Sequence, residues 1–164
     1  EQWFRDVVSF AVLTGMRRGE IINLKWKDVD LERRLIRVSN SETFTTKTGK
    51  TRTVPMNERV YVLLKDRNTH MHEEHVFTFE GKPIRPDFLS RKFRFCIRKS
   101  GLPRALHFHS LRHTFATWLV QGSVSIYEVQ KLLGHSSLAV TQIYSHLAAS
   151  ELHNAVNKLD SIST

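Results

Sequence analysis

The sequence of 164 residues predicts one domain, covering residues 1–164, that is mainly helical with a small antiparallel β-sheet (an α+β fold). Three observations support this prediction. Apolar residues recur at helical spacing over most of the chain, whereas residues 35–54 have the pattern of short strands. No internal repeat or low-complexity linker divides the sequence, and its apolar share of 40% is sufficient for a buried core.

The first third of the chain predicts two helices followed by strands. Apolar residues from Trp3 to Ala11 form a helical stripe that ends near Gly15, and a second short helix is expected from Arg18 to Leu24. Residues 28–32 are polar and predict a turn. The expected strands are residues 35–38, 43–46 and 51–54, with a hairpin turn at residues 47–50.

Helical patterns return from Asn57 onward. Asn57 is the predicted N-cap of one helix, and Asp87 is the predicted N-cap of another that ends before Gly101. Between these helices, residues 76–79 form an apolar stretch that is too short to assign to a helix or a strand.

Four more helices are expected after His109. The first is expected to bury Leu111, Phe115, Trp118 and Leu119. The capping box from Ser125 to Glu128 begins the second, which ends at Gly134. The third carries Tyr144, and the last is an amphipathic helix that begins at Ser150.

The charge of the chain is its first functional signal. Twenty-five Lys and Arg against sixteen Asp and Glu give a net charge of +9, which favours a polyanionic partner, with nucleic acid the leading candidate. A generic cationic protein remains the alternative on charge alone. The single cysteine, Cys96, excludes an internal disulfide framework and suits a reducing cytoplasm. No apolar run approaches the roughly 20 residues of a membrane span.

Two segments in the first third contain candidate site residues. Thr14-Gly-Met-Arg17-Arg-Gly-Glu20-Ile, taken alone, fits an ordinary helix-capping arrangement. Thr46-Lys47-Thr-Gly-Lys-Thr-Arg-Thr-Val-Pro55 places Lys47 on a hairpin, where it is either solvated or able to deliver an ammonium group to a substrate. The Gly-Lys-Thr within it is not a nucleotide loop, because the first Gly of that pattern and the following helix are missing.

A third group of residues lies between His109 and Tyr144. His109 and Arg112 are three residues apart and share a helical face, which is predicted to line a cleft because the buried stripe uses the opposite positions. His135 follows a helix-ending Gly, and Tyr144 comes nine residues later. Two Arg, a Lys, two His and a Tyr match phosphoryl transfer through a phosphotyrosine intermediate, in which guanidinium groups stabilise the charge without a metal.

These segments resemble, in order and spacing, the signature boxes of the tyrosine recombinase family, specifically its phage-integrase and Xer branch, from about residue 3 to residue 158. The resemblance implies a site-specific recombinase or integrase of mobile elements that cleaves and rejoins double-stranded DNA through a 3′-phosphotyrosine intermediate, with no cofactor. It also implies a cytoplasmic, nucleoid-associated protein, a homotetramer on DNA and a monomer as an isolated domain. An N-terminal core-binding domain is expected upstream, since the opening Glu1-Gln-Trp-Phe reads as a domain boundary.

The resemblance assigns a role to each residue of the boxes. Arg17 and Arg112 would clamp the scissile phosphate, and Glu20 would support them without reacting. Lys47 would be the general acid that protonates the departing 5′-oxygen. The resemblance identifies Lys47 less directly than the others, because residues 39–45 are longer than a minimal hairpin requires.

The remaining roles concern the nucleophile. Tyr144 would attack the phosphorus, His109 would assist proton transfer, and His135 would hydrogen-bond a phosphate oxygen. Ser110 stands where the family often has Asp, which would alter the surroundings of His109 or Arg112.

Several alternatives accompany this hypothesis. The candidates for contacts with the DNA backbone are Arg18, Arg91, Arg94 and Arg98, with a solvated surface as the competing interpretation. His107, His109 and His113 lack the Cys or carboxylate that would complete a metal site. A type IB topoisomerase-like nicking enzyme and a catalytically inactive DNA-binding module are the rival functions. The stripe in residues 152–159 could fold back on its own domain; the resemblance implies instead that it docks on a neighbouring protomer, so that Tyr144 is correctly placed only in the DNA-bound assembly.

Overall fold

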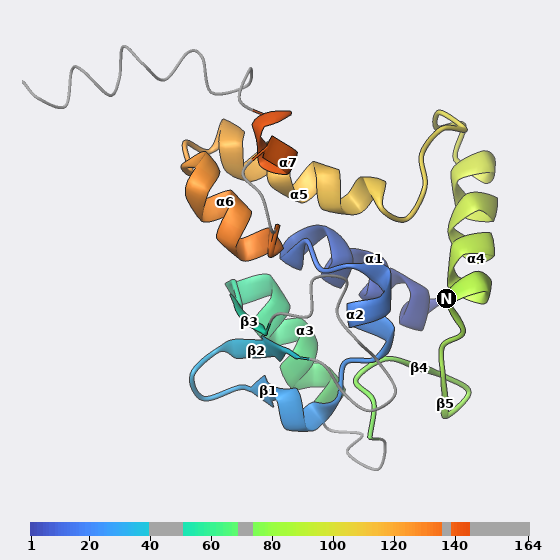
Figure 1. Cartoon of the computed structure of the whole chain (residues 1–164). Helices are drawn as coiled ribbons and strands as arrows, with labels where there is room; N and C mark the ends of the chain where they lie inside the picture. The colour runs from blue at the N-terminus through green and yellow to red at the C-terminus, as the bar shows by residue number, and fades with distance from the viewer. Residues whose placement is uncertain (40–50, 69–73, 136–138, 145–164) are drawn as a thin grey trace, which may run out of the picture. The chain divides into compact units, whose positions relative to one another are not determined.

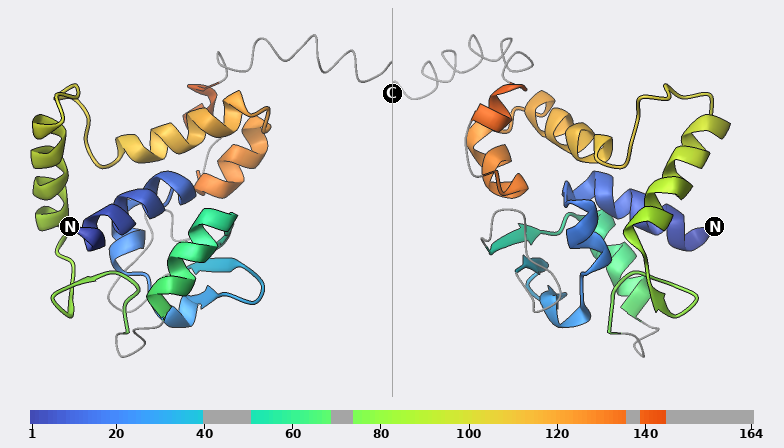
Figure 2. Two further views of the ribbon diagram at one scale, coloured as in Figure 1. Left: turned by 180° about the vertical axis from the view of Figure 1, so that it is seen from behind. Right: turned by 45° about the vertical axis from the view of Figure 1, so that its right-hand side comes forward.

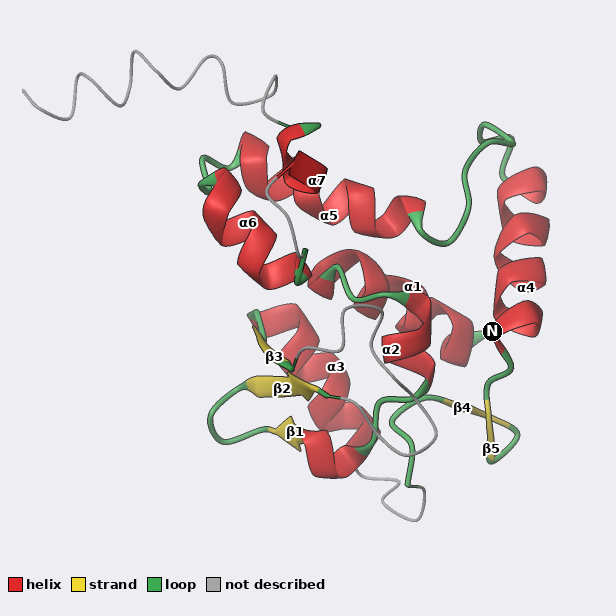
Figure 3. Cartoon of the chain, in the orientation of Figure 1, coloured by secondary structure: helices red, strands yellow, loops and turns green. Residues whose placement is uncertain are grey.

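The computed structural model describes residues 1–39, 51–68, 74–135 and 139–144, which are mainly helical with two small antiparallel sheets (Figures 1 and 3). The predicted fold class is therefore confirmed. The chain divides into two compact units, residues 1–115 and 116–164, and each is described by itself. The described helices include none that is long and apolar enough to cross a membrane.

Residues 1–115 contain most of the elements. They are α1 (Gln2–Thr14), α2 (Arg18–Ile22), the 3-10 helix η1 (Trp26–Asp28), β1 (Val29–Asp30), β2 (Leu35–Val38), β3 (Arg52–Pro55), α3 (Glu58–Asn68), β4 (Thr78–Phe79), β5 (Lys82–Pro83), α4 (Pro86–Lys99) and the start of α5 (Ser110–Gln121). The remainder of α5, α6 (Ile126–Leu133) and α7 (Ala139–Gln142) belong to the second unit.

A left-handed glycine separates the first two helices. Gly15 ends α1 with φ 62°, and its N–H donates to the carbonyl of Ala11 at 3.0 Å. The chain then turns, and Arg17 precedes α2 in an extended conformation as its N-cap. Gly15 thereby places the backbone of Arg17 directly at the start of a new helix.

The larger sheet has the order β1-β2-β3, and all its pairs are antiparallel. Its core face carries Ile36, Val38 and Val54, which are buried, while Thr53 faces outward. Strands at 35–38 and 51–54 were expected and are confirmed within one residue. The expected strand 43–46 and the turn 47–50 lie outside the described residues.

The prediction of a turn at residues 28–32 is wrong in part, because Val29 and Asp30 form β1 and pair with Ile36 and Leu35. A two-residue strand is too short to show the alternation that identifies strands in a sequence. The turn follows at residues 31–34, where Asp30 Oδ1 accepts from the N–H of Arg33 at 2.8 Å.

The core of residues 1–115 lies between the helices and the sheet. α3 packs against α1, and α4 packs against α2 (Figure 2). Phe10 and Phe77 are fully buried and meet edge to face, with ring centroids 4.9 Å apart. The stretch 76–79, left unassigned from the sequence, ends in β4, which forms a hairpin with β5 across Glu80 and Gly81, both at positive φ.

The predicted caps are right for α3 and wrong for α4. Asn57 Oδ1 accepts from the N–H of Val60 at 3.0 Å, as an N-cap does. α4 begins two residues earlier than expected, with Arg85 as the N-cap and Asp87 inside the first turn. The reason is Pro86, whose fixed φ and missing N–H suit the first helical position.

The buried face of α5 differs in part from the prediction. Phe115 is buried as expected, but Trp118 is 54% exposed, and Arg112, Ala116 and Val120 are buried at positions four residues apart. The sequence pattern predicts an open face at Arg112, because the apolar stripe uses the opposite positions. This prediction is wrong: Arg112 is buried, and the carbonyl oxygen of Gly15 provides the partner that a buried arginine requires.

The second unit follows its local signals closely. Ser125 Oγ accepts from the N–H of Glu128, and Glu128 Oε2 accepts from the N–H of Ser125, so the predicted capping box is confirmed. Gly134 ends α6 with φ 65°. Tyr144, expected within the next helix, lies in the turn just after α7. The expected helix from Ser150 lies outside the described residues.

Candidate catalytic site

The site begins with Arg17 at the start of α2. Its backbone N–H donates to Oε2 of Glu20 at 2.7 Å, and its Nη1 donates to Oε1 of the same carboxylate at 3.1 Å. The side chain of Arg17 remains 18% exposed. Glu20 therefore fixes both the backbone N–H and the guanidinium of Arg17.

Arg52 of β3 completes the environment of Glu20. Its Nη1 and Nη2 donate to the two carboxylate oxygens at 2.7 and 2.8 Å, a bidentate pair. The Glu20 side chain is 1% exposed and that of Arg52 is 10% exposed. Burial raises the pKa of Glu20, but the hydrogen bonds and charge of Arg52, followed by those of Arg17, outweigh it and hold this pKa below its ordinary value.

Sequence reasoning missed Arg52, although one signal was present. In a strand, side chains two residues apart share a face. Arg52 therefore lies on the same face as Val54, which is buried. A charged side chain on the core face of a strand requires a buried partner of opposite charge, and Glu20 provides it.

Arg112 meets the same turn from α5. Its side chain is buried, and Nη1 donates to the carbonyl oxygen of Gly15 at 2.7 Å. Gly15 is two residues before Arg17, so the long-range contact joins the two predicted phosphate-binding arginines through one short stretch of backbone. Arg112 does not line the open groove that Arg17 reaches.

The histidines around the start of α5 form a cluster. The rings of His109 and His113 lie edge to face with centroids 5.1 Å apart. Burial lowers the pKa of His109 to about 4, and the charges of neighbouring side chains, His113 and Arg112 first, act in the same direction. His109 is thus a neutral imidazole at pH 7, able to accept a proton.

Ser110 hydrogen-bonds His107. Its Oγ lies 2.7 Å from Nδ1 of His107 and also accepts from the N–H of His107. The serine therefore fixes the ring of His107, two residues before His109.

An open groove of about 650 Å³ brings several of these residues to one surface. It is lined by Arg17, Arg18, Gly19, Ser90, Arg94, His107, Phe108 and His109. The candidates Arg17 and His109 therefore share one hollow. Arg18 is held at its edge by donating to Ser90 Oγ of α4 at 2.5 Å. With three arginines along it, the groove is suited to an anionic ligand.

A second hollow, of about 400 Å³, lies along α4. It is lined by Arg91, Arg94, Phe95, Ile97, Arg98, Arg104 and Leu106. The three predicted backbone-contact arginines of α4 therefore lie together and are exposed. Arg94 lines both hollows and links them into one basic surface.

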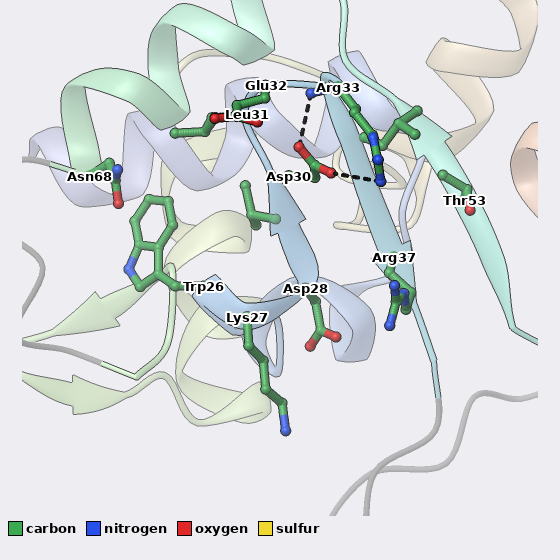
Figure 4. A pocket seen from close by; sticks show the side chains of 12 residues that line it. Trp26, Lys27, Asp28, Asp30, Leu31, Glu32, Arg33, Arg37, Thr53 and Asn68 are labelled. Carbon is green, nitrogen blue, oxygen red and sulfur yellow. Dashed lines mark hydrogen bonds and ion pairs between the residues drawn. The ribbon is translucent and has the colours of Figure 1, made fainter.

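A third hollow, of about 550 Å³, lies beside β1 and β2 and carries charges of both signs (Figure 4). Within it Asp30 accepts from the backbone of Arg33 and approaches its guanidinium at 3.9 Å. None of the predicted site residues that the structure describes lines this hollow. Within the described residues, no three His, Cys, Asp or Glu side chains are grouped so as to hold a metal ion.

The second unit holds the other two described candidates. Nδ1 of His135 lies 2.8 Å from Oγ1 of Thr141, which is fully buried. The carbonyl of Thr141 accepts from the N–H of Tyr144 at 3.1 Å, and the side chain of Tyr144 is largely buried. Thr141 is thus the common neighbour of His135 and Tyr144. Lys47, the remaining candidate, lies outside the described residues.

The whole arrangement matches one protein family. Residues 1–151 match the phage integrase family, and the chain belongs to it, which confirms the resemblance to tyrosine recombinases. The chain is 32% identical over 169 residues to the integrase of Salmonella phage P22, covering 96% of this chain and 43% of that protein. It is 34% identical over 159 residues to the tyrosine recombinase XerA of Saccharolobus solfataricus, covering 96% and 50%.

The fold is also shared with solved structures. The Tn1549 transposon integrase, in complex with a circular intermediate DNA, superposes with a TM-score of 0.78 at 26% identity, covering 87% of this chain and 54% of that chain. The chain spans about half the length of the curated relatives that it matches.

Proposed function

We propose that this chain is the catalytic part of a site-specific DNA recombinase, which cleaves and rejoins double-stranded DNA through a covalent bond to Tyr144. The observation that carries the proposal is the groove in which Arg17 and His109 lie together among further arginines. A phosphodiester carries one negative charge on its nonbridging oxygens, and guanidinium groups match those oxygens in charge and geometry.

The proposed reaction begins at a scissile phosphate bound by Arg17. The guanidinium of Arg17 neutralises the nonbridging oxygens as negative charge develops on the phosphate in the transition state. Arg112, which donates to the carbonyl of Gly15, adds a second positive charge. His135 donates a further hydrogen bond to a phosphate oxygen. Together these groups replace a metal ion in stabilising the transition state.

The nucleophile is the hydroxyl oxygen of Tyr144. It forms a bond to phosphorus as the bond from phosphorus to the 5′-oxygen breaks. The neutral imidazole of His109 accepts the tyrosine proton, and Lys47 donates a proton to the departing 5′-oxygen. Attack by a 5′-hydroxyl of another strand reverses the step, so that the bond energy is conserved and no ATP is required.

The same proposal covers partners and location. Double-stranded DNA would lie along the basic surface, with Arg18, Arg91, Arg94 and Arg98 contacting its backbone. Four copies would assemble on DNA for strand exchange, in the cytoplasm and on the nucleoid. The DNA complex of the Tn1549 integrase, a protein of the same fold, supports DNA as the partner.

The test is covalent trapping in the full-length protein. A pool of nicked duplexes with randomised sequence is incubated with the protein, and adducts that survive denaturing detergent are isolated and sequenced to define the site. Wild type and Tyr127→Phe are expected to form adducts, since Tyr127 is an exposed tyrosine on α6; Tyr144→Phe is expected to form none.

Three outcomes would contradict the proposal. Salt-sensitive DNA binding without any adduct would indicate an inactive DNA-binding module. Adducts at unrelated sequences, with relaxation of supercoiled plasmid and no strand exchange, would indicate a topoisomerase-like nicking enzyme. Adducts that persist in Tyr144→Phe would place the nucleophile elsewhere.

A further inference from the structure

Arg52 is the cation on β3 that closes the network around Arg17. We propose that Arg52 is a positioning residue: acting through Glu20, it keeps the guanidinium of Arg17 available to the substrate phosphate. The inference deepens the proposed function and rests on it for the identity of the substrate. It assigns a role to a residue that touches neither the phosphate nor the open groove.

The contacts make Arg52 the principal partner of Glu20. Arg52 donates to both carboxylate oxygens at 2.7 and 2.8 Å, whereas the guanidinium of Arg17 donates to one of them at 3.1 Å. An arginine has five N–H donors, so this single bond leaves most of the donors of Arg17 outside the Glu20 pair. Because Arg52 binds both oxygens of Glu20, Glu20 positions the guanidinium of Arg17 through one hydrogen bond and leaves its other donors for a substrate.

The charges lead to the same conclusion. Glu20 is ionised, because its pKa lies below the ordinary value, and its single negative charge faces two guanidinium groups. The cluster of Arg17, Glu20 and Arg52 therefore carries a net charge of +1. Because Arg52 compensates the carboxylate, the positive charge of Arg17 is directed to the groove that Arg17 lines.

Removal of Arg52 would reverse this balance. The carboxylate of Glu20 is buried, and a buried charge that loses one partner interacts more strongly with the opposite charge that remains. Arg17 is three residues away and already in contact, so it would turn toward Glu20 and pair with both oxygens. Its charge would then be neutralised within the protein, and the phosphate would lose its clamp.

Arg52 also stands at a defined point of the sheet. It pairs with Val38 across β2 and β3, and Lys47 lies between these two residues in the sequence. The contact with Glu20, 32 residues earlier in the chain, thus ties the first residue of β3 to the helix that has Arg17 as its N-cap.

The first test compares adduct formation in the full-length protein, on a nicked duplex selected from the randomised pool. Arg52→Met keeps the length of the side chain and removes its charge; we expect single-turnover adduct formation to slow by about tenfold to a hundredfold. DNA binding should change by less than about threefold, since Arg52 is not proposed to contact DNA. Arg33→Met, at an 80% exposed arginine of the preceding turn, is the matched control and should react like wild type.

A double variant separates positioning from general loss of structure. In Arg52→Met combined with Glu20→Gln there is no carboxylate to capture Arg17, so adduct formation should recover at least about threefold over Arg52→Met alone. A purely structural role predicts that the two losses add. A double variant as slow as Arg52→Met, or slower, would overturn the proposal, as would wild-type rates in a folded Arg52→Met.

The second test is independent of DNA cleavage. Inorganic phosphate is titrated into protein with 15N-labelled arginine, and the Nε resonance of Arg17 is followed by NMR. Phosphate should shift this resonance in the wild type, more weakly in Arg52→Met, and again strongly in the double variant. An equal response in wild type and Arg52→Met, or no response in the wild type, contradicts the positioning role.

The two tests have distinguishable failures. If the wild type forms no adduct but the phosphate response depends on Arg52 as expected, the proposed function fails and the positioning role stands. If wild type and Arg52→Met form adducts at the same rate, the positioning role is wrong but the proposed function is not. Should Arg52→Met not fold, Arg52→Lys replaces it, since lysine keeps the charge without the bidentate fork; the losses should then be smaller and of the same sign.

Discussion

His135 and Thr141 are joined by a hydrogen bond of 2.8 Å between Nδ1 of the imidazole and Oγ1 of the fully buried threonine. The same threonine accepts, through its carbonyl oxygen, the N–H of Tyr144. One side chain therefore orients the predicted phosphate-binding histidine, and the backbone of the same residue supports the turn that carries the predicted nucleophile. Sequence spacing placed His135 and Tyr144 nine residues apart without indicating what connects them.

Thr141→Val should impair the reaction more than the fold. Valine keeps the shape of threonine but removes the hydroxyl, which costs about 1 kcal/mol of unfolding free energy. The ring of His135 loses its orientation, so adduct formation should fall by roughly tenfold to a hundredfold. Thr114→Val is the matched control, because the hydroxyl of Thr114 bonds only a backbone carbonyl of α5 among the contacts described. Equal rates in the two variants would exclude the orienting role.

Glu20 should make stability depend on pH in the acidic range. Its folded pKa is lowered, so its contribution is fully present above the unfolded value of about 4.3 and is lost as the pH falls through the folded pKa. Chemical denaturation from pH 6 to pH 3 measures this loss. Glu20→Gln should reduce the unfolding free energy at pH 7 by about 2 kcal/mol and flatten the acidic decline. An unchanged decline would assign it to other carboxylates.

His109 should remain neutral well below neutral pH. Its folded pKa of about 4 lies under the unfolded value of about 6.5, so between these values the unfolded chain binds the extra proton. Above pH 6.5 the ring of His109 therefore imposes no penalty on the free energy of unfolding. As the pH falls from 6.5 toward 4, protonation of the unfolded chain lowers this free energy increasingly. Titration of the ring resonances by NMR gives the pKa directly, and a value at or above 6.5 would refute the account.

His113 provides a check on the cause of that shift. Its charge is the first contributor after burial to the low pKa of His109. His113→Gln should therefore raise the pKa of His109, but leave it below the ordinary value, because burial acts more strongly. A pKa of His109 that does not move in this variant would show that the ring of His113 carries no charge in the pH range concerned.

The parts of the fold that the sequence predicted are those decided by neighbouring residues. Gly15 ends α1 and the box from Ser125 to Glu128 starts α6, because each depends on contacts within a few residues. β1 was not predicted, because a strand of two residues is too short to show an alternation of apolar and polar side chains. The helical spacing of Trp118 predicts that it is buried, but its exposure depends on tertiary packing that a helical pattern does not contain.

The site divides in the same way. The candidates were found as residue types in order, and the structure brings Arg17, Glu20, His109 and Arg112 together in the first unit. The sequence could not predict contacts between residues that are far apart in the chain. Arg52 meets Glu20 across 32 residues, and Arg112 meets Gly15 across 97. Burial of an arginine becomes intelligible only when its distant partner is known.

The most direct measurement of the central claim is the chemical identity of the covalent adduct. The trapped protein–DNA complex is digested with nuclease and protease, and mass spectrometry locates the residual nucleotide. We expect a nucleotide joined through its 3′-phosphate to the peptide that contains Tyr144, and none on the peptides that contain Tyr61 or Tyr127. A nucleotide on another residue, or the absence of any modified peptide from a DNA-bound protein, would contradict it.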